Sequence, residues 1–81
     1  MTVTIDDKAI KDLSKIQKSD AKKILSKITL LEKFPHIPNT KKLTNFEPPF
    51  RLRVGNYRVL FDIEDTTLTV YRVKHRQESY K

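Results

Sequence analysis

The basic residues of this 81-residue chain change type along its length. Every basic residue before position 50 is Lys, whereas every Arg lies between Arg51 and Arg76. Guanidinium groups make planar, bidentate contacts with phosphate and carboxylate that Lys cannot reproduce. We therefore expect the second half of the chain to contact an anionic partner.

The segment Phe50–Phe61 places three of these arginines around a predicted turn. Side chains alternate along a strand, so Arg51 and Arg53 share one face, roughly 6.6 Å apart, and can contact neighbouring groups of an extended anionic chain. The alternative is that these arginines only occupy solvent-facing strand positions, which require polar side chains, and bind nothing. The candidate residues are Arg51, Arg53, Arg58, Arg72, Lys74, His75, Arg76 and Tyr80, with Lys41 and Lys42 from the preceding loop.

Metal-free cleavage of RNA is one reaction that such residues perform. The ribose 2′-hydroxyl attacks the adjacent phosphate, which requires a proton acceptor, a proton donor and cations that stabilise the phosphoryl oxygens. Arg supplies the cations, but its pKa above about 12 makes it an implausible base. We expect proton transfer by His75, whose type has an unperturbed pKa of about 6.5, or by Tyr80. Alternatively, His75 is a surface residue at a strand end and Tyr80 packs the tail onto the sheet.

The composition argues against several other kinds of site. The chain has no Cys and only two His, and its acidic residues are scattered, so no metal site is expected. A single Gly argues against a phosphate-cradling loop, and no elbow motif indicates a Ser-His-Asp triad. We expect no cofactor. The formal charge of +7 and the pI near 9.8 favour polyanions or an acidic protein as partners.

The first half of the chain has the periodicity of one strand and two helices. Residues 2–5 alternate like a short strand. Apolar residues recur at helical spacing over residues 8–17 and again from Ser19 to Phe34. Asp6 or Asp7 is the expected N-cap of the first helix and Ser19 that of the second.

A loop and a meander of strands follow. Residues 36–49 lack sustained periodicity, so we interpret them as an ordered loop with at most a short turn at residues 41–43. The pair Gly55-Asn56 predicts a two-residue hairpin turn, after which a strand continues to residue 63.

The last strand and the element order predict the fold. Over residues 67–74, Leu68 and Val70 alternate with Tyr71 and Val73, which suggests a strand covered on both faces. The whole chain, residues 1–81, is then one α+β domain of order β-α-α-β-β-β. In this fold a two-helix hairpin packs on one face of a mainly antiparallel four-stranded sheet, and the opposite face is open. No membrane-spanning run or signal peptide is recognised, so we expect a soluble, cytoplasmic protein without membrane contact.

Two segments, RLRVGNYRVLFDI at residues 51–63 and VYRVKHRQESY at residues 70–80, resemble the RelE/ParE superfamily of bacterial and archaeal type II toxins, within its RelE branch. The resemblance implies a fold like that of microbial ribonucleases and cleavage of messenger RNA in the ribosomal A site. By this resemblance Arg51 and Arg53 match the paired basic positions, Arg58 the phosphate-stabilising arginine, Arg76 the late basic residue and Tyr80 the near-terminal tyrosine.

The sequence departs from the best-studied pattern at one pair of positions. That pattern has lysines where this chain has Arg51 and Arg53, so the general base is not assigned by the resemblance. Some relatives carry a His directly before the late Arg, as His75 precedes Arg76, which favours His75 for proton transfer. We expect the guanidiniums to converge beside His75 and Tyr80.

The resemblance also implies partners. These are a cognate antitoxin, RelB-like, acidic and helical, the 70S ribosome with its messenger RNA, and operator DNA contacted only through the antitoxin complex. The residues expected to bind RNA or the ribosome are Arg51, Arg53, Arg72, Lys74, Lys41 and Lys42. Two alternatives remain: a ParE-like inhibitor of DNA gyrase, and a catalytically degenerate module that binds antitoxin and operator.

Overall fold

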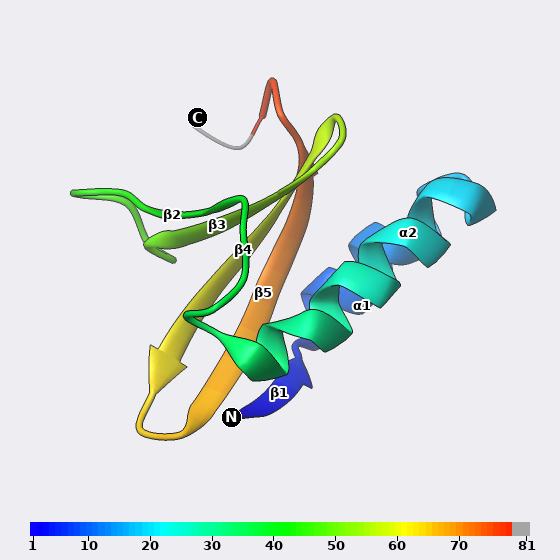
Figure 1. Ribbon diagram of the computed structural model, residues 1–81. Helices are drawn as coiled ribbons and strands as arrows, with labels where there is room; N and C mark the ends of the chain where they lie inside the picture. The colour runs from blue at the N-terminus through cyan, green and yellow to red at the C-terminus, as the bar shows by residue number, and fades with distance from the viewer. Residues whose placement is uncertain (79–81) are drawn as a thin grey trace.

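Two helices lie on one side of a five-stranded sheet in the computed structural model, which describes residues 1–78 (Figure 1). The strands are ordered β1-β5-β4-β3-β2; β1 runs parallel to β5 and the other neighbours are antiparallel. No helix within residues 1–78 combines the length and apolarity needed to cross a bilayer. The elements are β1 (Thr2–Ile5), α1 (Asp7–Ser14), α2 (Lys18–Thr29), the 3₁₀ helix η1 (Leu30–Lys33), β2 (Thr40–Lys42), β3 (Phe50–Val54), β4 (Tyr57–Glu64) and β5 (Thr67–His75).

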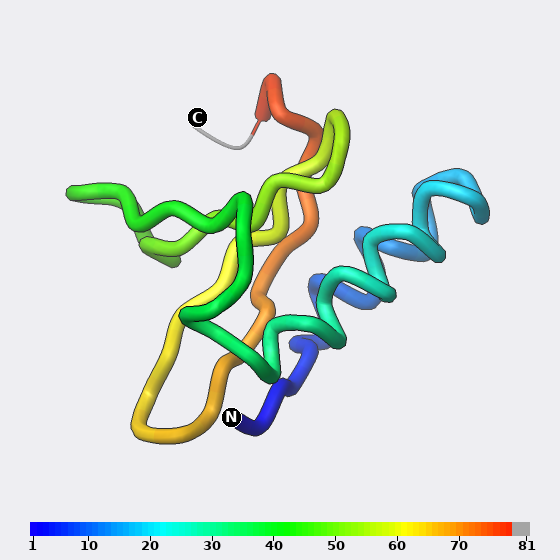
Figure 2. Tube along the Cα trace, in the orientation of Figure 1, coloured from blue at the N-terminus to red at the C-terminus, as the bar shows by residue number. Residues whose placement is uncertain are grey.

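Both predicted helices form, with different boundaries. Asp6 caps α1 as expected, since its carboxylate accepts the Lys8 N–H at 3.0 Å. Ser19 is not the N-cap of α2, because the helix begins at Lys18 and its N-cap is Gln17, two residues before Ser19; Gln17 makes no side-chain capping bond. The second helix was also predicted too long: it tightens into η1 after Thr29. Figure 2 shows the chain leaving η1 and running to the far edge of the sheet.

The sheet has five strands and not the four predicted, because part of the expected loop pairs with β3. Strand β2 forms the edge, with Thr40 opposite Leu52 and Lys42 opposite Phe50. Three residues are too few to display an alternating pattern, so their pairing depends on the neighbouring strand and not on their own sequence. The predicted fold class, α+β with both helices on one face, is confirmed.

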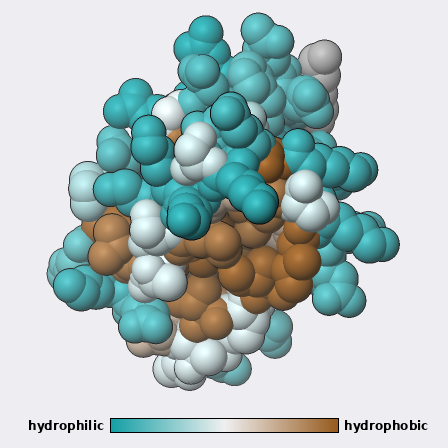
Figure 3. Space-filling view, turned by 90° about the vertical axis from the view of Figure 1, so that its right-hand side faces the viewer, coloured by the Kyte–Doolittle hydropathy of each residue, from teal (hydrophilic) through white to brown (hydrophobic). Residues whose placement is uncertain are grey.

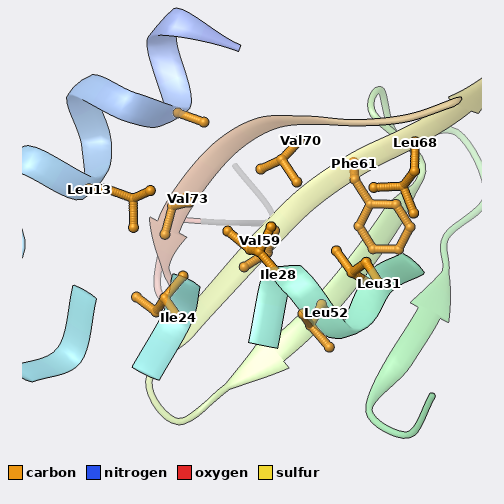
Figure 4. Close-up of a cluster of buried hydrophobic side chains, with 11 residues drawn as sticks. Leu13, Ile24, Ile28, Leu31, Leu52, Val59, Phe61, Leu68, Val70 and Val73 are labelled. Atoms are coloured by element: carbon orange, nitrogen blue, oxygen red, sulfur yellow. The ribbon is translucent and has the colours of Figure 1, made fainter. Parts of the chain in front are cut away.

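The core fills the space between the helices and the sheet (Figure 4). Phe61 at the middle of β4 is fully buried and packs edge-on against Phe34, at a centroid distance of 5.6 Å, and stacks on Phe50 at 5.3 Å. The other buried core residues are Ala9, Leu13, Ile24, Ile28, Leu31, Leu52, Val59, Leu68, Val70 and Val73.

A β-bulge changes the faces on which the residues of β5 lie, so the faces predicted from the sequence are partly wrong. Phe61 pairs with Val70 while Leu60 pairs with Arg72, so Tyr71 is the extra residue and the alternation is reset there. Val73 consequently lies in the core with Val70, and the two were wrongly placed on opposite faces. After the bulge, Arg72 is the cross-strand partner of Leu60 and Lys74 that of Arg58.

The sequence predicted that the face of the sheet away from the helices is open, but part of this face is covered. Leu60 on β4 is 5% exposed and Arg51 on β3 is 3% exposed. The segment between β2 and β3 closes on itself through a hydrogen bond from the Leu43 N–H to the Pro49 carbonyl at 2.8 Å, and Arg51 lies over the ring of Phe46 at 5.6 Å. This segment therefore contributes to covering part of that face.

Candidate functional site

Cationic residues gather at the hairpin end of the sheet face away from the helices. Arg53 on β3, Arg58 on β4 and Lys74 on β5 are paired in one row across three neighbouring strands. In the next row Lys41 pairs with Arg51. Neighbouring strands lie roughly 4.8 Å apart, so this end of the face carries a dense positive charge.

Three of the arginines line a shallow hollow of about 230 Å³ on this face. This is smaller than the roughly 300–1,000 Å³ of pockets for drug-sized ligands, and it suits a phosphate group better than a whole cofactor. We call it the cationic hollow; its lining residues are Asn39, Thr40, Lys41, Arg51, Arg53 and Arg58.

Two guanidiniums of the cationic hollow are held by neutral acceptors. Arg58 donates from one nitrogen to the carbonyls of Gly55, at 2.9 Å, and Tyr57, at 3.0 Å. Gly55 has a φ of 58°, the left-handed value that the first position of this hairpin turn requires, as predicted from the Gly55-Asn56 pair. Arg53 donates to the side-chain oxygen of Asn39 at 3.2 Å. None of these acceptors carries a negative charge, so both guanidiniums keep their charge for a ligand.

Arg51 lines the cationic hollow but is largely committed to the protein. Its guanidinium donates to the carbonyls of Pro48 and Phe50, the latter at 3.1 Å, and packs on Phe46. Arg51 and Arg53 do share one face of β3, as predicted, but only Arg53 is solvent-exposed. Arg51 therefore holds the 43–49 segment against the sheet and adds a partly shielded charge to the hollow.

Arg72 is paired with a residue that the sequence reading missed. Its Nε and Nη2 donate to the two carboxylate oxygens of Asp12 on α1, at 2.8 and 3.0 Å, and Asp12 also accepts the backbone N–H of Val73 at 2.9 Å. Burial raises the pKa of Asp12, but the hydrogen bonds from Arg72 and Val73 and the charges of Arg72 and Lys74 outweigh it, so the pKa lies below its ordinary value. The pair joins α1 to β5, and a carboxylate offsets the charge of Arg72.

His75 lies on the other face of the sheet from Arg58 and Lys74. It pairs with Tyr57 across the β4–β5 ladder, and the two rings meet edge-on with centroids 5.7 Å apart. Its Nδ1 accepts the N–H of Gln77 at 3.3 Å. The structure thus brings Arg53 and Arg58 together without bringing His75 into the cationic hollow.

The remaining predicted residues are placed as follows. Arg76 is exposed, and its backbone N–H donates to the Asn56 carbonyl at 2.7 Å, so Arg76 lies beside the hairpin turn at Gly55-Asn56. Lys42 lies over the ring of Phe50, away from the cationic hollow. Tyr80 lies outside the described residues. Within residues 1–78 no three His, Asp or Glu side chains are placed to share a metal ion.

Comparison with known proteins assigns the chain to a family. The family model described as the ParE toxin of type II toxin-antitoxin systems, parDE, matches residues 3–80. A search of curated protein sequences gave no significant match.

Solved structures of similar fold include toxin-antitoxin complexes. A chain of the RelBE2 toxin-antitoxin complex from Mycobacterium tuberculosis is 31% identical, with a TM-score of 0.78, and the match covers 93% of this chain and 96% of that one. A chain of the RelB-RelE complex from Methanococcus jannaschii is 24% identical, with a TM-score of 0.75 and coverages of 95% and 94%. The isolated RelE toxin of Escherichia coli is 18% identical, with a TM-score of 0.73 and coverages of 91% and 82%. The latter two show likeness of fold alone. With a family model matched over nearly its whole length, this chain belongs to the ParE toxin family of type II toxin-antitoxin systems, within the RelE/ParE superfamily.

Proposed function

We propose that this toxin is a metal-independent endoribonuclease that cleaves messenger RNA in the A site of the 70S ribosome and so inhibits translation. The observation that carries the proposal is the pairing of Arg53 with Arg58 in one hollow, each held by uncharged acceptors. Two preorganised cations beside a small hollow suit a reaction in which negative charge builds on phosphoryl oxygens.

The reaction proposed is an internal transesterification. The 2′-oxygen forms a bond to phosphorus while the bond from phosphorus to the 5′-oxygen breaks, and the proton lost from the 2′-hydroxyl is balanced by one delivered to the 5′-oxygen. Arg53 and Arg58 stabilise the phosphoryl oxygens, and Lys74 extends the row along the RNA backbone.

Proton transfer is assigned to His75 or Tyr80, with Arg76 as a further cation. Because His75 packs on Tyr57, it reaches the scissile linkage only if the RNA passes around the hairpin end of the sheet. Separate His75→Ala and Tyr80→Phe variants identify the residue that transfers the proton. The variant that lacks this residue should lose cleavage and retain RNA binding.

The antitoxin is proposed to be a RelB-like protein with an acidic, helical segment. The charge of +7 attracts acidic chains, and the helical side of the molecule shows an apolar area bordered by hydrophilic side chains (Figure 3). Ile10 and Leu25 on the helices are 52% and 42% exposed. An amphipathic helix covers such a surface. In this proposal the toxin contacts operator DNA only through its complex with the antitoxin. Failure of the toxin to copurify with the product of the neighbouring reading frame would count against the proposed antitoxin.

Inhibition of DNA gyrase is the second candidate, favoured by the ParE description of the matching family model. Purified toxin is tested on translating ribosomes with a defined messenger and, in parallel, in a gyrase supercoiling assay. We expect cleaved messenger and unaffected supercoiling. Inhibited supercoiling with intact messenger supports the gyrase function, and no effect in either assay supports a degenerate antitoxin-binding module.

The decisive variants remove one positive charge each. Arg58→Ala is compared with Lys27→Ala, which lies exposed on α2 away from the cationic hollow. Arg58→Ala is expected to lower cleavage about 100-fold, the effect of losing one preorganised donor, while Lys27→Ala cleaves like the parent. Equal activity of the two variants would contradict the proposed site.

A further inference from the structure

Asn39 contacts Arg53 through both its backbone and its side chain. Its carbonyl accepts the Arg53 N–H at 2.9 Å, which adds one bond beyond the end of the β2–β3 ladder. Its side-chain oxygen accepts from the Arg53 guanidinium at 3.2 Å. Asn39 has a φ of 66°, a left-handed conformation that Asn adopts more readily than most residues, and it lines the cationic hollow.

The chain holds two of its arginines in chemically different ways. Arg72 is held by the carboxylate of Asp12, which offsets its positive charge. Arg53 is held by the amide of Asn39, which fixes the guanidinium and leaves its charge intact. An arginine that serves the fold gains from a carboxylate partner, whereas one that binds an anion needs a neutral partner.

We propose that Asn39 is a positioning residue that holds the Arg53 guanidinium in the cationic hollow, opposite Arg58, ready for an anionic group. Arg53 is exposed and pairs across the ladder with another cation, so repulsion and side-chain entropy both favour conformations directed away from the hollow. The hydrogen bond to Asn39 opposes both effects. That the anion is the phosphate of an RNA chain rests on the proposed function.

The test compares variants that preserve the backbone. Asn39→Gly keeps access to positive φ and removes the amide; Asn39→Asp keeps an acceptor and adds a negative charge. Asn45→Gly is the matched control, because Asn45 has a φ of 64° and does not line the cationic hollow. Inorganic phosphate and an RNA oligonucleotide with a 2′-deoxy scissile nucleotide are titrated into each protein, and the Nε–Hε signal of Arg53 is followed by NMR.

We expect Asn39→Gly to increase the mobility of the Arg53 guanidinium and to weaken RNA binding about threefold to tenfold. Asn39→Asp should weaken binding further and reduce the salt dependence of binding by about one phosphate contact. In an Arg53→Ala background Asn39→Gly should have no further effect, because Asn39 acts through Arg53.

Three results would overturn the inference: an unchanged Arg53 signal in Asn39→Gly, equal losses of binding in Asn39→Gly and Asn45→Gly, or additive losses with Arg53→Ala. If the parent protein binds phosphate but neither binds nor cleaves RNA, the proposed function fails, and the phosphate and NMR measurements still decide the role of Asn39.

Discussion

Arg53 and Arg58 are direct partners across the β3–β4 hairpin, so two cations extend from neighbouring positions on one face of the sheet. Like charges in directly opposite positions destabilise a sheet. The arrangement therefore works against the stability of the hairpin, as expected when a site is shaped for an anion.

Replacing Arg53 with Thr should separate stability from activity. Thr favours strands and removes the repulsion, so the free energy of unfolding should stay the same or rise by up to about 1 kcal/mol. Cleavage of messenger RNA on ribosomes should fall about 100-fold. Urea unfolding and single-turnover cleavage measure the two effects, and a destabilised Arg53→Thr protein with full activity would contradict this account.

The Asp12–Arg72 pair should contribute to stability and not to binding. Asp12→Ala removes the acceptor of both Arg72 and the Val73 N–H, which should lower the free energy of unfolding by about 1–3 kcal/mol at neutral pH. Affinity for RNA should change little, because Asp12 does not line the cationic hollow.

The contribution of Asp12 should depend on pH in a defined direction. The pKa of Asp12 is lowered in the folded protein from the ordinary value of 3.8, so its stabilisation is complete above that value. As the pH falls below 3.8 and through the folded pKa, the stabilisation is lost. The difference in unfolding free energy between the parent and Asp12→Ala should therefore narrow in acid; a difference that stays constant would be inconsistent with the ion pair.

The hairpin turn should tolerate Asn better than Ala at Gly55. Nothing lies within 4 Å of a Cβ built at Gly55, so a substitution is opposed by its φ of 58° and not by a clash. Gly55→Ala should cost about 1–2 kcal/mol, and Gly55→Asn less, because Asn adopts left-handed conformations more readily. Thermal unfolding of both variants checks this. Equal melting temperatures of Gly55→Ala and Gly55→Asn would show that the positive φ at Gly55 does not determine the cost of substitution.

The features that were predictable from the sequence are those encoded in local patterns. The apolar spacing around Leu13 and Ile24 indicated the helices, and Gly55-Asn56 indicated the hairpin, because each pattern repeats within a few residues. The segments around Arg58 and Arg76 indicated the superfamily.

The features that were missed depend on contacts between distant segments. The bulge at Tyr71 depends on how β4 and β5 align, and β2 on its pairing with β3. Asp12 and Arg72 are separated by 60 residues, and nothing in the helical pattern around Asp12 distinguishes it from a solvent-facing carboxylate. The face on which His75 lies follows from its cross-strand pairing with Tyr57.

The most direct test of the account is to map transcript 5′ ends in cells after brief induction of the parent toxin and of Arg58→Ala. The account predicts new 5′ ends within translated codons for the parent and their loss in Arg58→Ala. Growth arrest by the parent without such ends, or the same ends in Arg58→Ala, would contradict it.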